Sequence, residues 1–281
     1  MKPCIVMQSD FGNEGSLVAQ MHGVCKKVDP ALDIQDITHI IDAFDIRRAS
    51  KLLASTLTCW PVGTVFVSVV DPGVGSSRKA CVARTGNGYY IVTPDNGTLT
   101  LVDSLYGIEA VREIDEKINR YKDSELVNVF HGRDLFSYTA ARLASGIIDF
   151  NQVGPSYEVS GIVRYERLPY SIAEGQAEGF AHGDPAKNFG ILDTNIPNKE
   201  FPKTGIKVFD KVKLVLALDQ RIVFERTIQF CNTFADVKKG EVLLYNEVDL
   251  NLGIASNMAN FAEQYAIEGG KEYKLSLIKE P

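Results

Sequence analysis

The stretch TVFVSVVD, residues 64–71, constrains the fold of this chain more than any other. It is an almost unbroken apolar run rich in valine, which is typical of a central strand buried on both faces. Segments with helical periodicity precede it at 16–28 and 45–57, and each follows a strand-like run, at 4–8 and 33–38. This alternation predicts an α/β domain with a mostly parallel central sheet.

The alternation continues for the first half of the chain and then stops. Residues 79–95 are predicted to form a hairpin turning at Gly-Asn-Gly, and helices are predicted over 97–106 and 133–146. Later segments are rich in turn formers and β-type runs, with one short helical segment within 256–267. The sequence therefore predicts three parts: an α/β domain over 1–162, a linker over 163–172 and a smaller β-rich domain over 173–281.

Charge and hydropathy exclude several functions. The chain has 281 residues and a net charge of −6, with no basic block to neutralise phosphates, so nucleic acid is not an expected partner. The acidic balance mildly favours a cationic small molecule, although a solvated acidic surface explains it more simply. No segment reaches the roughly 18 apolar residues that a membrane span needs.

The cysteines do not form a recognisable framework. There are five, an odd number, scattered without C-x-x-C spacing, which argues against disulfides and against a cysteine zinc site. The opening residues MKPCIVMQSD resemble a strand and lack the features of a signal peptide. We therefore expect a cytoplasmic protein without a metal.

Polar side chains follow the predicted strands where each strand ends. Asp10 follows the first strand and Asp71 the apolar run, Asp95 and Asn96 follow the hairpin, and His131 follows LVNVF. Ligands of open α/β sheets bind at the carboxyl ends of the strands. Taken singly, each of these could be an ordinary turn, a helix cap or a satisfied buried histidine. Taken together at one sheet edge, they predict a binding site.

Four motifs in this order resemble the S-adenosylmethionine hydroxide adenosyltransferase family: SDFG (9–12), VVDPGVGSSR (69–78), TPDNG (93–97) and FHGRDLF (130–136). TNIP (194–197) is also similar. The GVG within the second motif fits neither phosphate-loop spacing. Members of the family are S-adenosylmethionine hydrolases, related in fold to fluorinating and chlorinating enzymes. The resemblance implies an α/β domain, a C-terminal β-barrel domain, no cofactor besides the substrate, and a homotrimer with active sites between subunits.

The resemblance also implies a catalytic set, Asp71, Arg78 and His131. The implied reaction is displacement at the ribose C5′ by water or hydroxide, which releases methionine and adenosine. A sulfonium leaves without protonation, so the difficulty is to orient the water and take its proton. Asp71 and His131 can each accept or relay that proton, and Arg78 can stabilise hydroxide character. The residues leave open which of the two is the base.

Other positions are implied to bind the nucleoside. Asp10 matches an aspartate that accepts hydrogen bonds from the ribose hydroxyls, and Asn96 is either a ribose contact or a support. Phe44 matches an aromatic residue against the ribose, although a core phenylalanine fits equally well. In the second domain, the resemblance implies that Asp184, displaced from the usual position of the aspartate, and Phe189 bind the nucleoside, with Phe189 stacking on the base.

Two departures bear on the activity. Where the halogenases carry a tyrosine, a threonine and a serine, this chain has Asp71, Val74 and Gly132, and a carboxylate would repel a halide. In GDPAKNFGIL, Asp184 is displaced and Ile191 replaces an asparagine. The alternatives are therefore an enzyme for another 5′-substituted nucleoside, or a non-catalytic nucleoside-binding protein. Halogenation is disfavoured.

Overall fold

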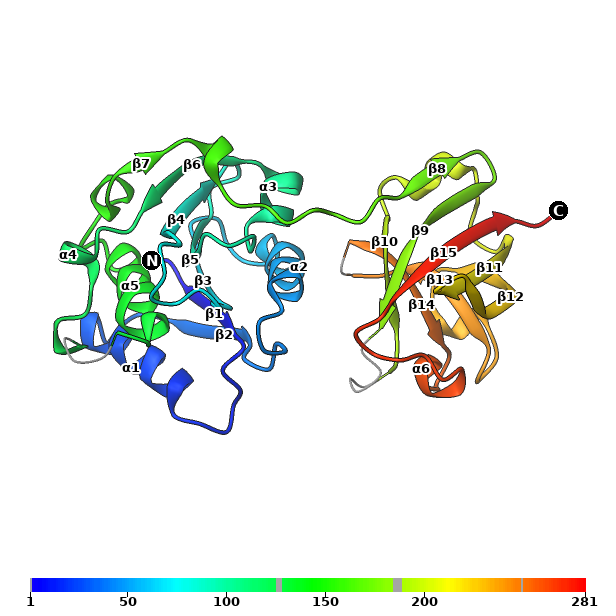
Figure 1. Cartoon of the computed structure of the whole chain (residues 1–281), viewed down its shortest axis with the longest axis horizontal. Coiled ribbons are helices and arrows are strands. Elements are labelled where there is room, and N and C mark those ends of the chain that lie inside the picture. The colour runs from blue at the N-terminus through cyan, green and yellow to red at the C-terminus, as the bar shows by residue number, and fades with distance from the viewer. Residues whose placement is uncertain (1, 125–127, 184–188, 249) are drawn as a thin grey trace. The chain divides into compact units, whose positions relative to one another are not determined.

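The computed structural model describes residues 2–124, 128–183, 189–248 and 250–281. They form two compact units, 1–165 and 166–281, and the predicted linker contains the point of division (Figure 1). Among the described residues, no helix is long and apolar enough to cross a membrane. All five cysteines are free thiols.

The first unit is built on a seven-stranded sheet in the order β2-β1-β3-β5-β4-β6-β7. Strands β2, β1, β3 and β5 are parallel, which confirms the mostly parallel sheet, and the other three add to it antiparallel. Every residue of β3 is buried, as its valine-rich sequence predicts. The strands are β1 (Ile5–Ser9), β2 (Ile34–Thr38), β3 (Val65–Val69), β4 (Ala80–Thr85), β5 (Tyr90–Pro94), β6 (Ile108–Glu113) and β7 (Ser156–Tyr157).

Helices cover both faces of this sheet (Figure 1). Helix α1 packs with α5 on one face, and α2 packs with α3 on the other. The Asp45 side chain caps α2 by accepting a hydrogen bond from the amide of Arg48. The helices are α1 (Leu17–Val28), α2 (Ile46–Leu57), α3 (Thr100–Tyr106), α4 (Glu116–Asn119) and α5 (Tyr138–Ala144).

The helix predicted over 133–146 differs from a regular α-helix. Its first part, Gly132–Ser137, winds as a π-helix, and only α5 is α-helical. π-Helical turns within α-helices occur frequently at functional sites. This one begins directly after His131.

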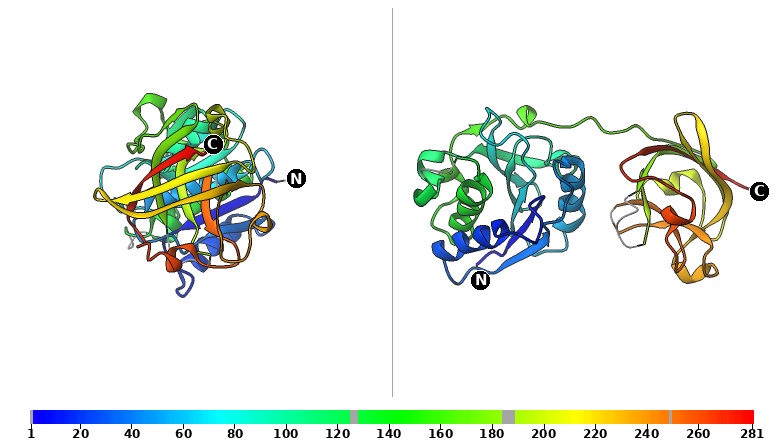
Figure 2. Two further views of the ribbon diagram at one scale, coloured as in Figure 1. Left: turned by 90° about the vertical axis from the view of Figure 1, so that its right-hand side faces the viewer. Right: turned by 60° about the horizontal axis from the view of Figure 1, so that its bottom comes forward.

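The second unit is a closed seven-stranded barrel (Figure 2). The ring runs β9-β10-β14-β13-β12-β11-β15 and closes because β9 pairs with both β10 and β15, while β8 extends β9 outside the ring. Buried and exposed residues alternate along β9, so one face of the strand points into the apolar interior. The strands are β8 (Ser171–Ala173), β9 (Gln176–Gly183), β10 (Leu192–Pro197), β11 (Lys211–Leu218), β12 (Arg221–Cys231), β13 (Val242–Asn246), β14 (Asn251–Ser256) and β15 (Glu272–Lys279).

The barrel confirms the fold class expected of the second domain. The predicted short helical segment contains α6 (Phe261–Gln264). Strand β8 begins at Ser171, which lies inside the stretch predicted as a linker.

Candidate active site

The predicted polar residues share one edge of the first sheet. Strands β1 and β3 are paired in parallel register to their last residues, so Asp10 and Asp71 leave the sheet at the same edge. Strand β5 runs parallel to β3 and ends just before Asp95 and Asn96. The parallel register therefore brings these strand exits to one edge of the sheet.

The loop after β3 folds back on itself through two turns. The amide of Val74 donates to the carbonyl of Asp71 at 3.3 Å, and the amide of Ser76 donates to the carbonyl of Gly73 at 3.0 Å. The Ser76 hydroxyl accepts from the amide of Arg78 at 3.2 Å. A Cβ at Gly73 would lie 3.0 Å from Cγ of Arg78, so a glycine here lets the arginine return over the loop.

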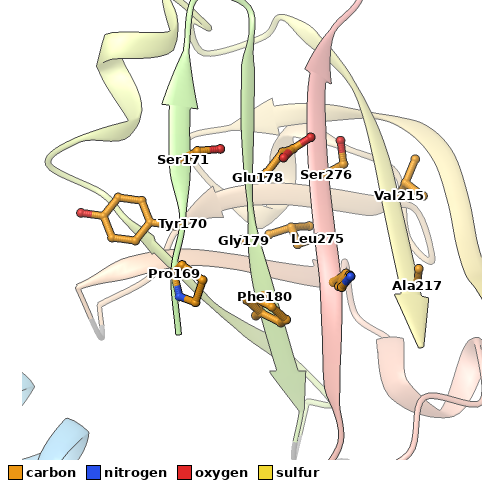
Figure 3. Close-up of a pocket in the computed structure, with 11 residues that line it drawn as sticks. Pro169, Tyr170, Ser171, Glu178, Gly179, Phe180, Val215, Ala217, Leu275 and Ser276 are labelled. Carbon is orange, nitrogen blue, oxygen red and sulfur yellow. The ribbon is translucent and has the colours of Figure 1, made fainter. Parts of the chain in front are cut away.

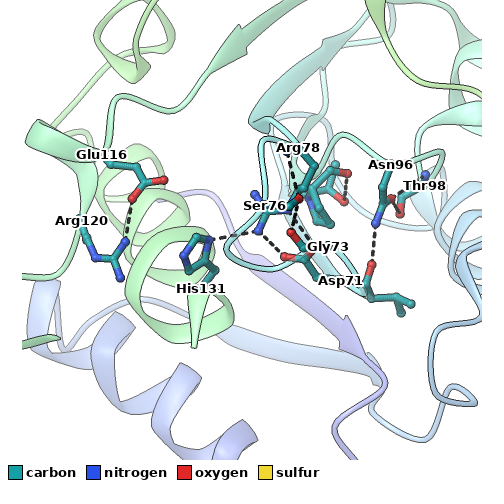
Figure 4. Close-up of polar contacts among 12 residues, drawn as sticks. Asp71, Gly73, Ser76, Arg78, Asn96, Thr98, Glu116, Arg120 and His131 are labelled. Atoms are coloured by element: carbon teal, nitrogen blue, oxygen red, sulfur yellow. Dashed lines mark hydrogen bonds and ion pairs between the residues drawn. The ribbon is translucent and has the colours of Figure 1, made fainter. Parts of the chain in front are cut away.

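Arg78 joins Asp71 to His131 (Figure 4). Its Nε donates to Asp71 Oδ1 at 2.8 Å, and one terminal nitrogen also contacts Asp71 Oδ2. The same terminal nitrogen lies 3.1 Å from His131 Nδ1. The side chains of Asp71 and Arg78 are only 6% and 11% exposed, and His131 is 7% exposed. A bidentate ion pair and an imidazole are thus held together largely out of water.

The contact with Arg78 fixes the state of His131. A guanidinium only donates hydrogen bonds, so Nδ1 must accept, and the proton of the neutral ring sits on Nε2. Burial lowers the pKa of His131 below its ordinary value of 6.5, and the positive charge of Arg78 lowers it further. The ring is therefore neutral at pH 7 and presents an Nε2–H donor.

Gly132 is required by an aromatic ring. A Cβ at this position would lie 2.8 Å from Cε2 of Phe11 and 3.2 Å from Cε2 of Phe130. The two rings pack edge to face, with centroids 5.7 Å apart. A serine at 132, as in the halogenases, would collide with this pair. Phe11 lies within the SDFG motif, but the motif predicts no role for it, and its packing against Gly132 supplies one.

Asp10 and Phe44 lie together. The amide of Phe44 donates to Asp10 Oδ2 at 3.0 Å, and among the described residues Oδ1 has no hydrogen bond. Phe44 has a left-handed backbone, with φ of 69°, and is 67% exposed. The alternative of a core phenylalanine is therefore wrong.

Asn96 and Asp95 support the edge. The amide nitrogen of Asn96 donates to the carbonyl of Val70 at 2.8 Å, and its oxygen accepts from the Thr98 hydroxyl at 2.9 Å. Asn96 thus holds the backbone of Val70, the residue before Asp71, in place. This favours the interpretation that Asn96 supports the site rather than contacting the ribose. Asp95 accepts from the Tyr157 hydroxyl at 2.9 Å, and burial raises the pKa of its carboxyl.

The two site residues predicted in the barrel unit have few contacts that define a role. Asp184 lies outside the described residues, whereas Phe189 is exposed and free to stack. A cavity of about 460 Å³ lies on the barrel between β8, β9, β15 and β11 (Figure 3). Tyr170, Glu178 and Lys274 are among its lining residues, and no predicted site residue is.

Two family models match the chain. The S-adenosylmethionine (SAM) hydroxide adenosyltransferase N-terminal domain matches residues 5–154, and the corresponding C-terminal domain matches residues 187–274.

Curated proteins with similar sequences align with nearly the whole of this chain. An (R)-S-adenosyl-L-methionine hydrolase of Salinispora tropica is 31% identical over 98% of both chains. Another, of Methanocaldococcus jannaschii, is 38% identical over 86% of this chain and 84% of its own. A fluorinase of an Actinoplanes strain is 27% identical over 95% of both. The crystal structure of an uncharacterized conserved protein from Thermotoga maritima has a TM-score of 0.87 at 31% identity and covers 96% of this chain and 99% of its own.

Proposed function

We propose that this chain, which belongs to the S-adenosylmethionine hydroxide adenosyltransferase family, hydrolyses S-adenosylmethionine to adenosine and methionine. The observation that carries the proposal is the buried Asp71–Arg78–His131 cluster at the ligand-binding edge of the sheet. It supplies a proton acceptor, a fixed positive charge and a neutral donor, which are what activation of a water molecule needs.

In the proposed mechanism a water oxygen attacks C5′ of the ribose. The C5′–S bond breaks, its electron pair returns to the sulfonium sulfur, and neutral methionine leaves. Because Nδ1 of His131 accepts from Arg78 and Nε2 carries the proton, we assign His131 to orient the water by donation. Asp71 then receives the proton of the water, and Arg78 stabilises the charge that develops on the oxygen.

Substrate binding follows from the neighbouring residues. We assign Asp10 Oδ1 to accept hydrogen bonds from the ribose hydroxyls, which the engagement of Oδ2 with the amide of Phe44 supports, and exposed Phe44 to offer an apolar surface beside it. Phe189 and Asp184 are proposed to contact the base. Asp71 disfavours a halide nucleophile, because a carboxylate repels an anion in a buried site.

Assembly, location and cofactor use are part of the proposal. We expect a homotrimer in which the barrel of a neighbouring subunit completes each site, without a catalytic cofactor. Free thiols are consistent with the cytoplasm. Sedimentation of the purified protein tests the trimer, and a fully active monomer contradicts it.

The decisive experiment incubates purified protein with S-adenosylmethionine and follows adenosine and methionine by chromatography. We expect both products in equal amounts, and a roughly 10²–10⁴-fold lower kcat for His131→Ala with adenosine affinity retained. Equal loss of turnover and adenosine binding would remove His131 from catalysis. Adenosine binding without any turnover in the natural chain would favour another 5′-substituted nucleoside, or a binding protein, over the hydrolase.

A further inference from the structure

A second histidine cluster lies apart from the Asp71 network. His22 comes from α1, Asp36 from β2, and His39 directly follows β2. Nε2 of His22 lies 2.9 Å from Asp36 Oδ1, and Nε2 of His39 lies 3.0 Å from the same oxygen. One possible ligand atom from each residue lies within 4.8 Å of the other two.

Nε2 of His39 lies 3.0 Å from Asp36 Oδ1 without the geometry of a hydrogen bond. The His39 side chain is only 3% exposed, yet its Nε2 is buried and makes no hydrogen bond among the described residues. On the other side of the ring, Nδ1 lies 2.7 Å from the Ser9 hydroxyl. If Nδ1 donates its proton to Ser9, Nε2 is left with a bare lone pair, and Asp36 Oδ1 lies beside that lone pair rather than in line with it. A cation between them would satisfy both groups.

We propose that His22, Asp36 and His39 bind one divalent ion of the zinc class. Two imidazoles and a carboxylate are a common zinc ligand set, with water in the fourth position. Magnesium and calcium prefer all-oxygen ligands and fit this set poorly. Tetrahedral bonds of roughly 2.0–2.2 Å place neighbouring ligand atoms about 3.4 Å apart, a small expansion of the His–Asp separations.

The residues around His39 resemble the outer shell of a preorganised metal site. Ser9 would act as the outer partner that orients His39, as hydrogen-bonded neighbours of metal-bound histidines commonly do. Ser9 immediately precedes Asp10, and the carbonyl of His39 accepts from the amide of Gly12 at 2.7 Å. A bound ion would therefore brace the loop that carries Asp10. Metal binding itself does not depend on the proposed hydrolysis.

The test is zinc titration of protein stripped with a chelator, by calorimetry and equilibrium dialysis. We expect one ion per chain, and a loss of affinity in His22→Ala larger than the roughly 10–100-fold that removal of an outer partner costs. Ser9→Ala should fall within that smaller range. His182→Ala is the matched control, because His182 is an exposed histidine of the barrel unit, and it should bind like the natural chain.

Two further measurements keep the proposal falsifiable. Asp36→Asn preserves the shape of the side chain and should also weaken binding, which covers the case of an unfolded His22→Ala. Cobalt(II) should give the visible absorption of a four-coordinate ion, lost in both variants. The absence of stoichiometric binding, or equal affinity of the natural chain and both variants, would reduce the cluster to hydrogen bonds alone.

Discussion

The two histidine clusters of the first unit differ in the charge at their centre. In one, the cation Arg78 stands between a carboxylate and an imidazole; in the other, the anion Asp36 stands between two imidazoles. A central guanidinium donates hydrogen bonds to both neighbours and repels a metal ion. A central carboxylate leaves imidazole lone pairs that attract one. Similar residue types thus suit proton chemistry in one place and metal binding in the other.

The largest effect should come from removing the central cation. Arg78→Met leaves the buried Asp71 carboxylate unpaired, so we expect a loss of about 3–5 kcal/mol in the free energy of unfolding, together with loss of turnover. Urea denaturation measures the loss in the free energy of unfolding. Arg84→Met is the control, because the exposed Arg84–Glu109 pair should contribute less than about 1 kcal/mol. The double change Arg78→Met with Asp71→Leu should recover most of the stability; no recovery would mean that the buried charge is not the cause.

The second largest effect is the stabilisation of the folded chain by zinc, which should depend on His22 and not on His131. At a free concentration 100 times the dissociation constant, an ion bound only by the folded chain stabilises it by about 2.7 kcal/mol. We expect this increase in the natural chain and in His131→Ala, and no increase in His22→Ala. Thermal unfolding with zinc and with chelator provides the comparison, and stabilisation that survives in His22→Ala places the ion elsewhere.

A smaller effect tests how His131 is held. Gly132→Ser brings a side chain against the Phe11 ring and should lower the free energy of unfolding by about 1–3 kcal/mol. Adding Phe11→Leu should relieve part of the collision. If the single variant is as stable as the natural chain, the Phe11 contact does not explain the glycine.

The smallest effect is on pH dependence. His131 has a lowered pKa in the folded chain, so the unfolded chain binds more protons below pH 6.5. Stability from this group is therefore fully present above pH 6.5 and is lost as pH falls toward the folded-state pKa, with a slope of at most about 1.4 kcal/mol per pH unit. Turnover should fall over the same acidic range. Urea denaturation at several pH values, with His131→Ala as the control, should show this slope in the natural chain only.

The sequence predicted the fold class of both units and the sheet edge at which Asp10 and Asp71 lie. The valine-rich run marks β3 because burial on both faces leaves no polar position, and parallel strands bring Asp10 and Asp71 to one edge. Strand β6 was not predicted, because its sequence IEAVRE mixes charged and apolar residues and becomes a strand only by pairing with β4.

The sequence did not predict the cluster of His22, Asp36 and His39 either, and its pattern pointed to a protein without a metal. His22 and Asp36 belong to different elements, and their separation in sequence matches no known ligand spacing. Only the contact of α1 with the middle of β2 brings His22 Nε2 within 2.9 Å of Asp36 Oδ1. The π-helix after His131 likewise has no sequence signal, since a regular helix has the same apolar pattern.

Closure of the barrel has a consequence for synthesis of the chain on the ribosome. Strand β15 lies between β11 and β9, so the ring needs the strand that is translated last among its members. The sheet of the first unit uses only strands up to β7, so it can fold while the barrel is still being made. Until β15 emerges, β9 and β11 each have one unpaired edge, and that interval is when the nascent protein is most exposed to chaperones and to aggregation.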